Sequence, residues 1–166
     1  MDLLSNLATN SAADCRPTSS PFCKLRQHFA LLHRILGPKQ TGRRIYRATM
    51  IASLSKALHL LARDARAAGL TTCCSLVLHV LEQLAPAKRT SYLSTTLHAL
   101  IHEWVTLSCS FLLDPLNSAR ATEMIEHMGS RRWERPVCRF QRESLLESLR
   151  AETVQLAAPR TGCRPR

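Results

Sequence analysis

Apolar side chains recur along this sequence at intervals of three and four residues, the spacing that places them on one face of an α-helix. One such series begins at Phe22 and ends before Gly37, and Ser20-Pro21 in front of it provides an N-cap followed by a first-turn proline. The same spacing and the same kinds of end signal predict helices over residues 20–36, 43–68, 72–84, 90–113, 114–128 and 139–158.

Two of these predicted helices are apolar enough to form the core. Residues 72–84 leave almost no polar face, which is typical of a helix surrounded by partners, and Pro86 is expected to end it. Thr90 or Ser91 can cap the helix that follows. Both apolar stretches are interrupted by His and Glu, so neither offers the about 20 clean residues that a membrane span needs.

The composition favours an all-α fold. Aromatic residues make up 5% of the chain and there are five glycines, which disfavours a β-sandwich or a glycine-rich nucleotide fold. We therefore expect an irregular helical bundle of about five to six helices. Its expected parts are a disordered tail over 1–19, a helical core domain over 20–129, a basic linker and C-terminal helix over 130–158, and a disordered basic tail over 159–166.

The formal net charge of +11 lies mainly in the flanks, because residues 61–113 are nearly balanced. Such a charge indicates an anionic partner, which can be a nucleic acid, an acidic protein or a membrane surface. A surface that only keeps the protein soluble, or a nuclear-import signal, has the same composition. Tyr46 and Trp133 lie among the cations and can stack on bases. The candidate residues for an anionic partner are Arg43, Arg44, Arg47, Lys88, Arg89, Arg131, Arg132 and Arg135.

Catalytic and metal-binding motifs are absent from the sequence, which contains no G-x-S-x-G, P-loop or dinucleotide fingerprint. His98 and His102 are spaced i, i+4, but the H-E-x-x-H order and a third ligand are missing, so we interpret them as structural or surface histidines. Cys73-Cys74 is interpreted as two small buried residues rather than a redox or lipidated pair. We expect no enzyme activity, no metal, no cofactor and no small-molecule substrate.

The cysteines and the first residues bear on the compartment. Seven cysteines form an odd set without C-x-x-C, which favours reduced, mostly buried thiols. The chain begins Met1-Asp2-Leu3-Leu4, without the basic and apolar regions of a secretory signal. We expect a cytoplasmic or nuclear protein that is not secreted.

Arg outnumbers Lys nineteen to four, a usage that follows codon degeneracy and indicates a reading frame overprinted on another gene. The segment 53–58, followed by 76–84 and 92–100, is similar in spacing to the helical region of the accessory C proteins of paramyxoviruses. The resemblance covers about 50 residues, has no diagnostic motif and transfers no functional residue. It implies a small, basic, non-enzymatic modulator of the viral polymerase and of host interferon signalling.

These observations predict a non-enzymatic accessory factor that acts through a protein partner, in a virus modulating the host antiviral response or the polymerase. One alternative is an RNA- or DNA-binding helical protein, either regulatory or a suppressor of RNA silencing. Another is an amphipathic protein that lies on a membrane surface through residues 21–36.

Overall fold

The computed structural model describes residues 21–37 and 48–157. These residues form six α-helices and no strand, which confirms the all-α prediction. The predicted tails over 1–19 and 159–166 lie outside the described residues. The helices are α2 (Pro21–Leu36), α3 (Ala48–Ala67), α4 (Thr71–Thr90), α5 (Thr95–Leu113), α6 (Ser118–Met128) and α7 (Arg139–Ala157).

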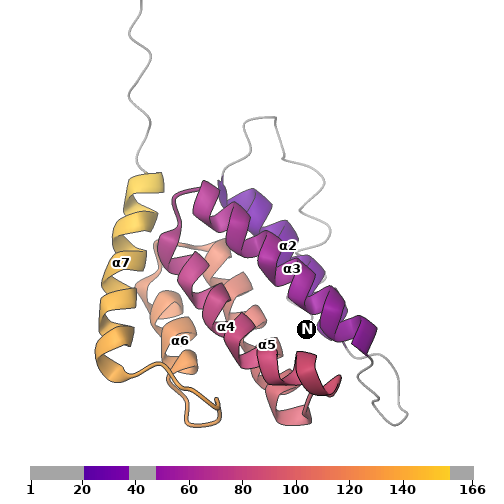
Figure 1. Ribbon diagram of the computed structural model, residues 1–166. Helices are drawn as coiled ribbons and strands as arrows, with labels where there is room; N and C mark the ends of the chain where they lie inside the picture. The colour runs from indigo at the N-terminus through magenta and orange to yellow at the C-terminus, as the bar shows by residue number, and fades with distance from the viewer. Residues whose placement is uncertain (1–20, 38–47, 158–166) are drawn as a thin grey trace, which may run out of the picture.

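Consecutive helices run in opposite directions (Figure 1). Each helix packs mainly on two others, and these contacts close into a ring with the order α2, α3, α4, α7, α6 and α5, where α5 packs back on α2. Every neighbouring pair in this ring is therefore antiparallel. The apolar faces that the sequence pattern predicted all turn toward the interior of the ring, where they form a single cluster of buried side chains.

The helix α5 contributes a buried apolar face to the core as predicted, whereas α4 is less enclosed than its sequence indicates. Trp104 of α5 is fully buried, and its ring packs edge-on against Phe29 of α2 with centroids 5.5 Å apart. On α4, which packs on α3 and α7, Leu78 is 38% exposed. Within the described ranges, none of the helices combines the length and the apolar character needed to cross a membrane.

The apolar face of α2 belongs to the core. Leu25, Phe29, Leu32 and Leu36 are at most 1% exposed, and they pack with residues of the other helices. An amphipathic helix that binds a membrane surface must offer this face to lipid. The structure therefore removes the observation on which the membrane-surface alternative was based.

The predicted stop at Pro86 is wrong, because α4 continues through it to Thr90. A proline inside a helix has no N–H, so the carbonyl of Glu82 loses its helical donor. Glu82 is solvent-exposed, and water can bond to that carbonyl. Leu84 and Ala87 are buried on either side of the proline, so packing continues across it.

The caps of α5 and α6 also differ from the predictions. Ser94 rather than Thr90 or Ser91 caps α5, since its side chain accepts the N–H of the third residue after it at 3.1 Å. Ser91 instead ends α4 with a left-handed φ of 54°. Asn117 caps α6, whereas Asp114, the predicted cap, ends α5. At the end of α3, Gly69 has the predicted left-handed conformation, with φ of 80°.

Residues 130–137 form a packed loop and not the predicted linker. Trp133 is 2% exposed, and its indole N–H donates to the carbonyl of His127 at 3.0 Å. Val137 is also buried, and Leu149 of α7 is fully enclosed in the same cluster as the residues of α2–α6. The expected boundary after Gly129 therefore does not separate two cores within the described part of the chain.

The ring closes through Glu152 of α7, which caps α4. The residue before α4 provides no side-chain cap. The Glu152 carboxylate accepts the backbone N–H of Thr72 at 2.9 and 3.2 Å, and the hydroxyl of Thr72 at 3.1 Å. The hydroxyl of Thr71 donates to the same carboxylate. An anion is stabilised at this position by the unpaired N–H groups and by the helix dipole.

Trp104 provides a test of the core. Its indole N–H has no hydrogen-bond acceptor among the described residues, and an unpaired buried donor costs about 1–3 kcal/mol. Trp104→Phe removes that donor together with some packing, so we expect the free energy of unfolding to change by about 1 kcal/mol or less. Trp104→Ala should lower it by about 3–5 kcal/mol. Equal losses for the two variants in urea unfolding would contradict this account.

Candidate functional site

Five of the eight residues predicted for an anionic partner lie in two clusters at the same end of the bundle. One is in the last turn of α4 and the other in the α6–α7 loop, and Figure 1 shows both at the end of the bundle where α5 begins. All five side chains are exposed, and we call them the basic end: Lys88, Arg89, Arg131, Arg132 and Arg135. Arg43, Arg44 and Arg47, with Tyr46, lie outside the described residues.

Gln83 holds the loop of the basic end on α4. Its side-chain amide donates to the carbonyl of Arg135 at 2.9 Å and accepts the N–H of Arg135 at 3.3 Å. Gln83 is 3% exposed, so its two polar atoms need these partners. Together with the buried Trp133, this pair fixes the backbone of the loop beside the last turns of α4.

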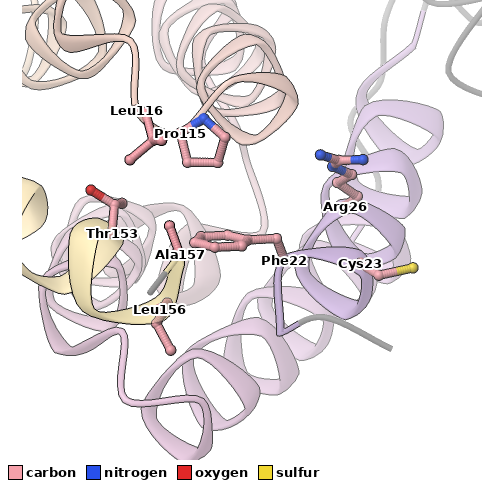
Figure 2. A pocket seen from close by; sticks show the side chains of 8 residues that line it. All are labelled: Phe22, Cys23, Arg26, Pro115, Leu116, Thr153, Leu156 and Ala157. Atoms are coloured by element: carbon pink, nitrogen blue, oxygen red, sulfur yellow. The ribbon is translucent and has the colours of Figure 1, made fainter. Parts of the chain in front are cut away.

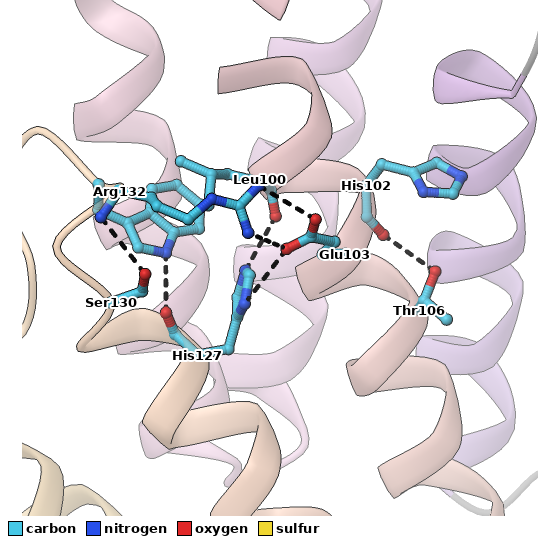
Figure 3. A network of polar contacts seen from close by, with 8 residues as sticks. Leu100, His102, Glu103, Thr106, His127, Ser130 and Arg132 are labelled. Atoms are coloured by element: carbon cyan, nitrogen blue, oxygen red, sulfur yellow. Dashed lines mark hydrogen bonds and ion pairs between the residues drawn. The ribbon is translucent and has the colours of Figure 1, made fainter. Parts of the chain in front are cut away.

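Arg132 ties the same loop to α5 (Figure 3). Its guanidinium donates to both carboxylate oxygens of Glu103, at 2.9 and 3.2 Å. His127 lies below this pair and donates from Nε2 to the carbonyl of Leu100 at 3.1 Å. Since Glu103 already neutralises Arg132, this arginine has a structural partner and is the least available member of the basic end.

The aromatic residues at the basic end differ from those predicted. Trp133 is buried, with its N–H occupied, so the interpretation that it stacks on bases is wrong. Tyr92 after α4 and Phe140 in the first turn of α7 are instead 62% and 79% exposed. Sequence reasoning missed both because it placed them inside amphipathic helices. The available signals were their position beside Lys88-Arg89 and Arg139, and their place off the apolar stripes of the predicted helices.

An open apolar groove lies at the opposite end of the bundle. It has a volume of about 290 Å³ and is formed by the first turns of α2, the α5–α6 turn and the last turns of α7. Figure 2 shows the ring of Phe22 reaching toward Ala157, with Leu116 on one side and Leu156 on the other. The lining residues are Phe22, Cys23, Arg26, Pro115, Leu116, Thr153, Leu156 and Ala157.

The groove offers little polar chemistry. Its one cation, Arg26, donates from Nε and from a terminal nitrogen to the carbonyl of Leu112, at 2.9 and 2.6 Å, and so caps the C-terminus of α5. Leu116, in the turn that forms one wall, is 62% exposed, and Leu113, the last residue of α5 before that turn, is 47% exposed. The groove therefore favours an apolar side chain over a charged ligand. Sequence reasoning did not find it, since three distant segments build it.

The histidine pair predicted as structural lies between α2 and α5. The rings of His98 and His102 stack at 6.4 Å, and His33 of α2 lies 5.0 Å from His102. The Nε2 atom of His98 is 3.1 Å from the carbonyl of Leu36. No group of three or more ligating side chains suited to a metal ion occurs in the described ranges.

The vicinal cysteines lie inside the core, as interpreted from the sequence. Cys73 and Cys74 are 7% and 4% exposed. Burial, with smaller contributions from Glu152 and Cys74, raises the pKa of the Cys73 thiol to about 12. A thiol with this pKa is protonated at neutral pH and is a poor nucleophile, which disfavours a redox or lipidation role.

Two half-buried histidines are expected to make the stability of the fold pH-dependent. Burial lowers the pKa of His102, as does the neighbouring His33, while Glu103 raises it. Burial also lowers the pKa of His79. In the unfolded chain these groups bind protons more tightly, with a pKa of roughly 6.5. The folded state therefore loses stability as the pH falls below that value.

We expect the free energy of unfolding to fall between about pH 7.5 and pH 5.5. The double variant His79→Gln/His102→Gln should show a weaker dependence, measured by urea unfolding across this range. His59→Gln, at an exposed position on α3, is the matched control and should behave like the wild-type protein. A double variant with the wild-type pH dependence would show that other groups are responsible.

The chain matches no protein-family model, no curated protein and no solved structure.

Proposed function

We propose that this protein is a non-enzymatic interaction factor that receives an apolar side chain or short apolar helix of a protein partner in the groove between α2, the α5–α6 turn and α7. The observation that carries the proposal is the open apolar groove with exposed Leu116 in its wall. Partners of this kind insert a few large side chains into such grooves and gain most of their binding energy there.

The size of the groove supports a protein partner over a small molecule. Its volume of about 290 Å³ is at the lower limit of pockets that enclose drug-sized ligands, roughly 300–1,000 Å³. The guanidinium of Arg26 is already bonded to the carbonyl of Leu112, so few polar groups remain to orient a substrate. If the resemblance to paramyxovirus C proteins is one of descent, the first partners to test are host interferon-signalling components and the viral polymerase.

The proposal is tested by affinity purification from host cells, with partners quantified by mass spectrometry. Leu116→Glu places a charge in the groove at a side chain that is 62% exposed, so folding should be unaffected. We expect this variant to lose the partner by about ten-fold or more. Leu78→Glu, at an exposed position on α4 that belongs neither to the groove nor to the basic end, is the control and should keep it.

Two results would contradict the proposed function. Recovery of the same partners by Leu116→Glu and by the wild-type protein would show that the groove is not the binding site. Recovery of nothing above background by the wild-type protein, in cells that support its normal expression, would count against an interaction role itself. Circular dichroism and thermal unfolding of each variant exclude a folding defect as the cause of a loss.

A further inference from the structure

The basic end carries cations that the fold itself does not use. Arg132 pairs with Glu103, and the neighbouring Arg139 pairs with Glu143. The remaining four cations of the basic end have no ion-pair partner within residues 21–37 and 48–157: Lys88, Arg89, Arg131 and Arg135. Lys88 and Arg89 interact favourably with the C-terminal dipole of α4. This interaction does not explain the two unpaired arginines of the loop, Arg131 and Arg135.

These cations project from a fixed backbone. Gln83 holds Arg135 on α4, Arg132 is bound to α5, and Trp133 is enclosed in the core. A polyanion that binds here does not have to order the loop first, which lowers the cost of association. The loop also holds one exposed carboxylate, Glu134, so it presents separate positive groups and not a uniform positive field.

Two exposed aromatic rings accompany the unpaired cations. Tyr92 lies two residues beyond the end of α4, and Phe140 is the second residue of α7. Rings that are 62% and 79% exposed contribute nothing to the core, and they are suited to stacking on planar groups. Bases of a single strand are free to stack on such rings, whereas bases of a duplex are already stacked on each other.

We propose that the basic end binds single-stranded nucleic acid, with phosphates on Lys88, Arg89, Arg131 and Arg135 and with bases on Tyr92 and Phe140. A lipid surface fits this end less well. The helices reach it with their termini (Figure 1), so no apolar helix face lies along it as an interfacial helix requires. The site is independent of the apolar groove, which lies at the other end of the bundle.

The test measures the anisotropy of a fluorescein-labelled 20-nucleotide polyuridine RNA with the full-length chain over a range of salt concentrations. For single strands, log K falls linearly with log salt concentration, and each phosphate that the protein neutralises adds about 0.7 to the steepness of that line. Alanine at Lys88, Arg89, Arg131 and Arg135 should therefore reduce the slope by about 3 and weaken binding by about ten-fold or more. Tyr92→Ala and Phe140→Ala should each weaken binding by roughly ten-fold.

A matched quadruple variant controls for net charge. Lys24, Lys56, Arg66 and Arg150 are exposed cations away from the basic end, and their replacement by Ala removes the same charge. This variant should keep most of the affinity. An equal loss in both quadruple variants would overturn the site, as would a loss that follows only Arg43, Arg44 and Arg47.

Two further results would also overturn the proposal. One is the absence of RNA binding at about 50 mM salt, where electrostatic contacts are strong. The other is flotation with phosphatidylserine vesicles that requires the same four cations, in a protein that does not bind the RNA. The variant Leu116→Glu should bind the RNA normally, so failure of the groove and failure of the basic end are distinguishable.

Discussion

The Glu152 carboxylate on the N-terminus of α4 is the contact on which the docking of α7, and with it the closure of the helix ring, depends. It joins the last helix to the middle of the chain and closes the ring. The apolar face of α7 is thin, since Leu149 and Thr153 are its buried residues. A hydrogen bond to a charged group contributes roughly 1.5–3 kcal/mol, and less where water reaches it, as at half-buried Glu152. Burial of one Leu contributes a similar amount.

Both surfaces depend on this docking of α7. Thr153, Leu156 and Ala157 form one wall of the groove, within two turns of Glu152. At the other end, the loop that carries Arg131 and Arg135 leads directly into α7. The antiparallel ring thus places an apolar groove and a cationic end on opposite ends of one small bundle.

The sequence predicted the helices well because their apolar spacing is a local property. The series from Leu25 to Leu36 and the left-handed Gly69 can be recognised from nearby residues alone. The continuation of α4 through Pro86 could not be recognised in this way, because it depends on the packing of the residues that follow the proline, here Ala87. Trp133 was predicted to lie in a basic linker, since its contact with His79 joins residues that are distant in the sequence.

The candidate sites were predicted only in part. The residue types alone predict that Lys88 and Arg131 are exposed. The pairing of Arg132 with Glu103 could not be predicted, because it depends on the folding of α5 against the loop. Tyr92 and Phe140 lie off the apolar stripes of their predicted helices, but their place at the basic end depends on the folding of α4 beside the α6–α7 loop. The groove escaped prediction since its three walls are far apart in the sequence.

Hydrogen exchange of Glu152→Ala, measured by mass spectrometry beside the wild-type protein, tests the ring closure most directly. The account predicts faster exchange in α7, in residues 130–138 and in the first turn of α4, with unchanged protection in α2, α3 and α5. Glu147→Ala, an exposed position on the same helix, should leave exchange unchanged. Wild-type protection throughout α7 in Glu152→Ala would contradict the account.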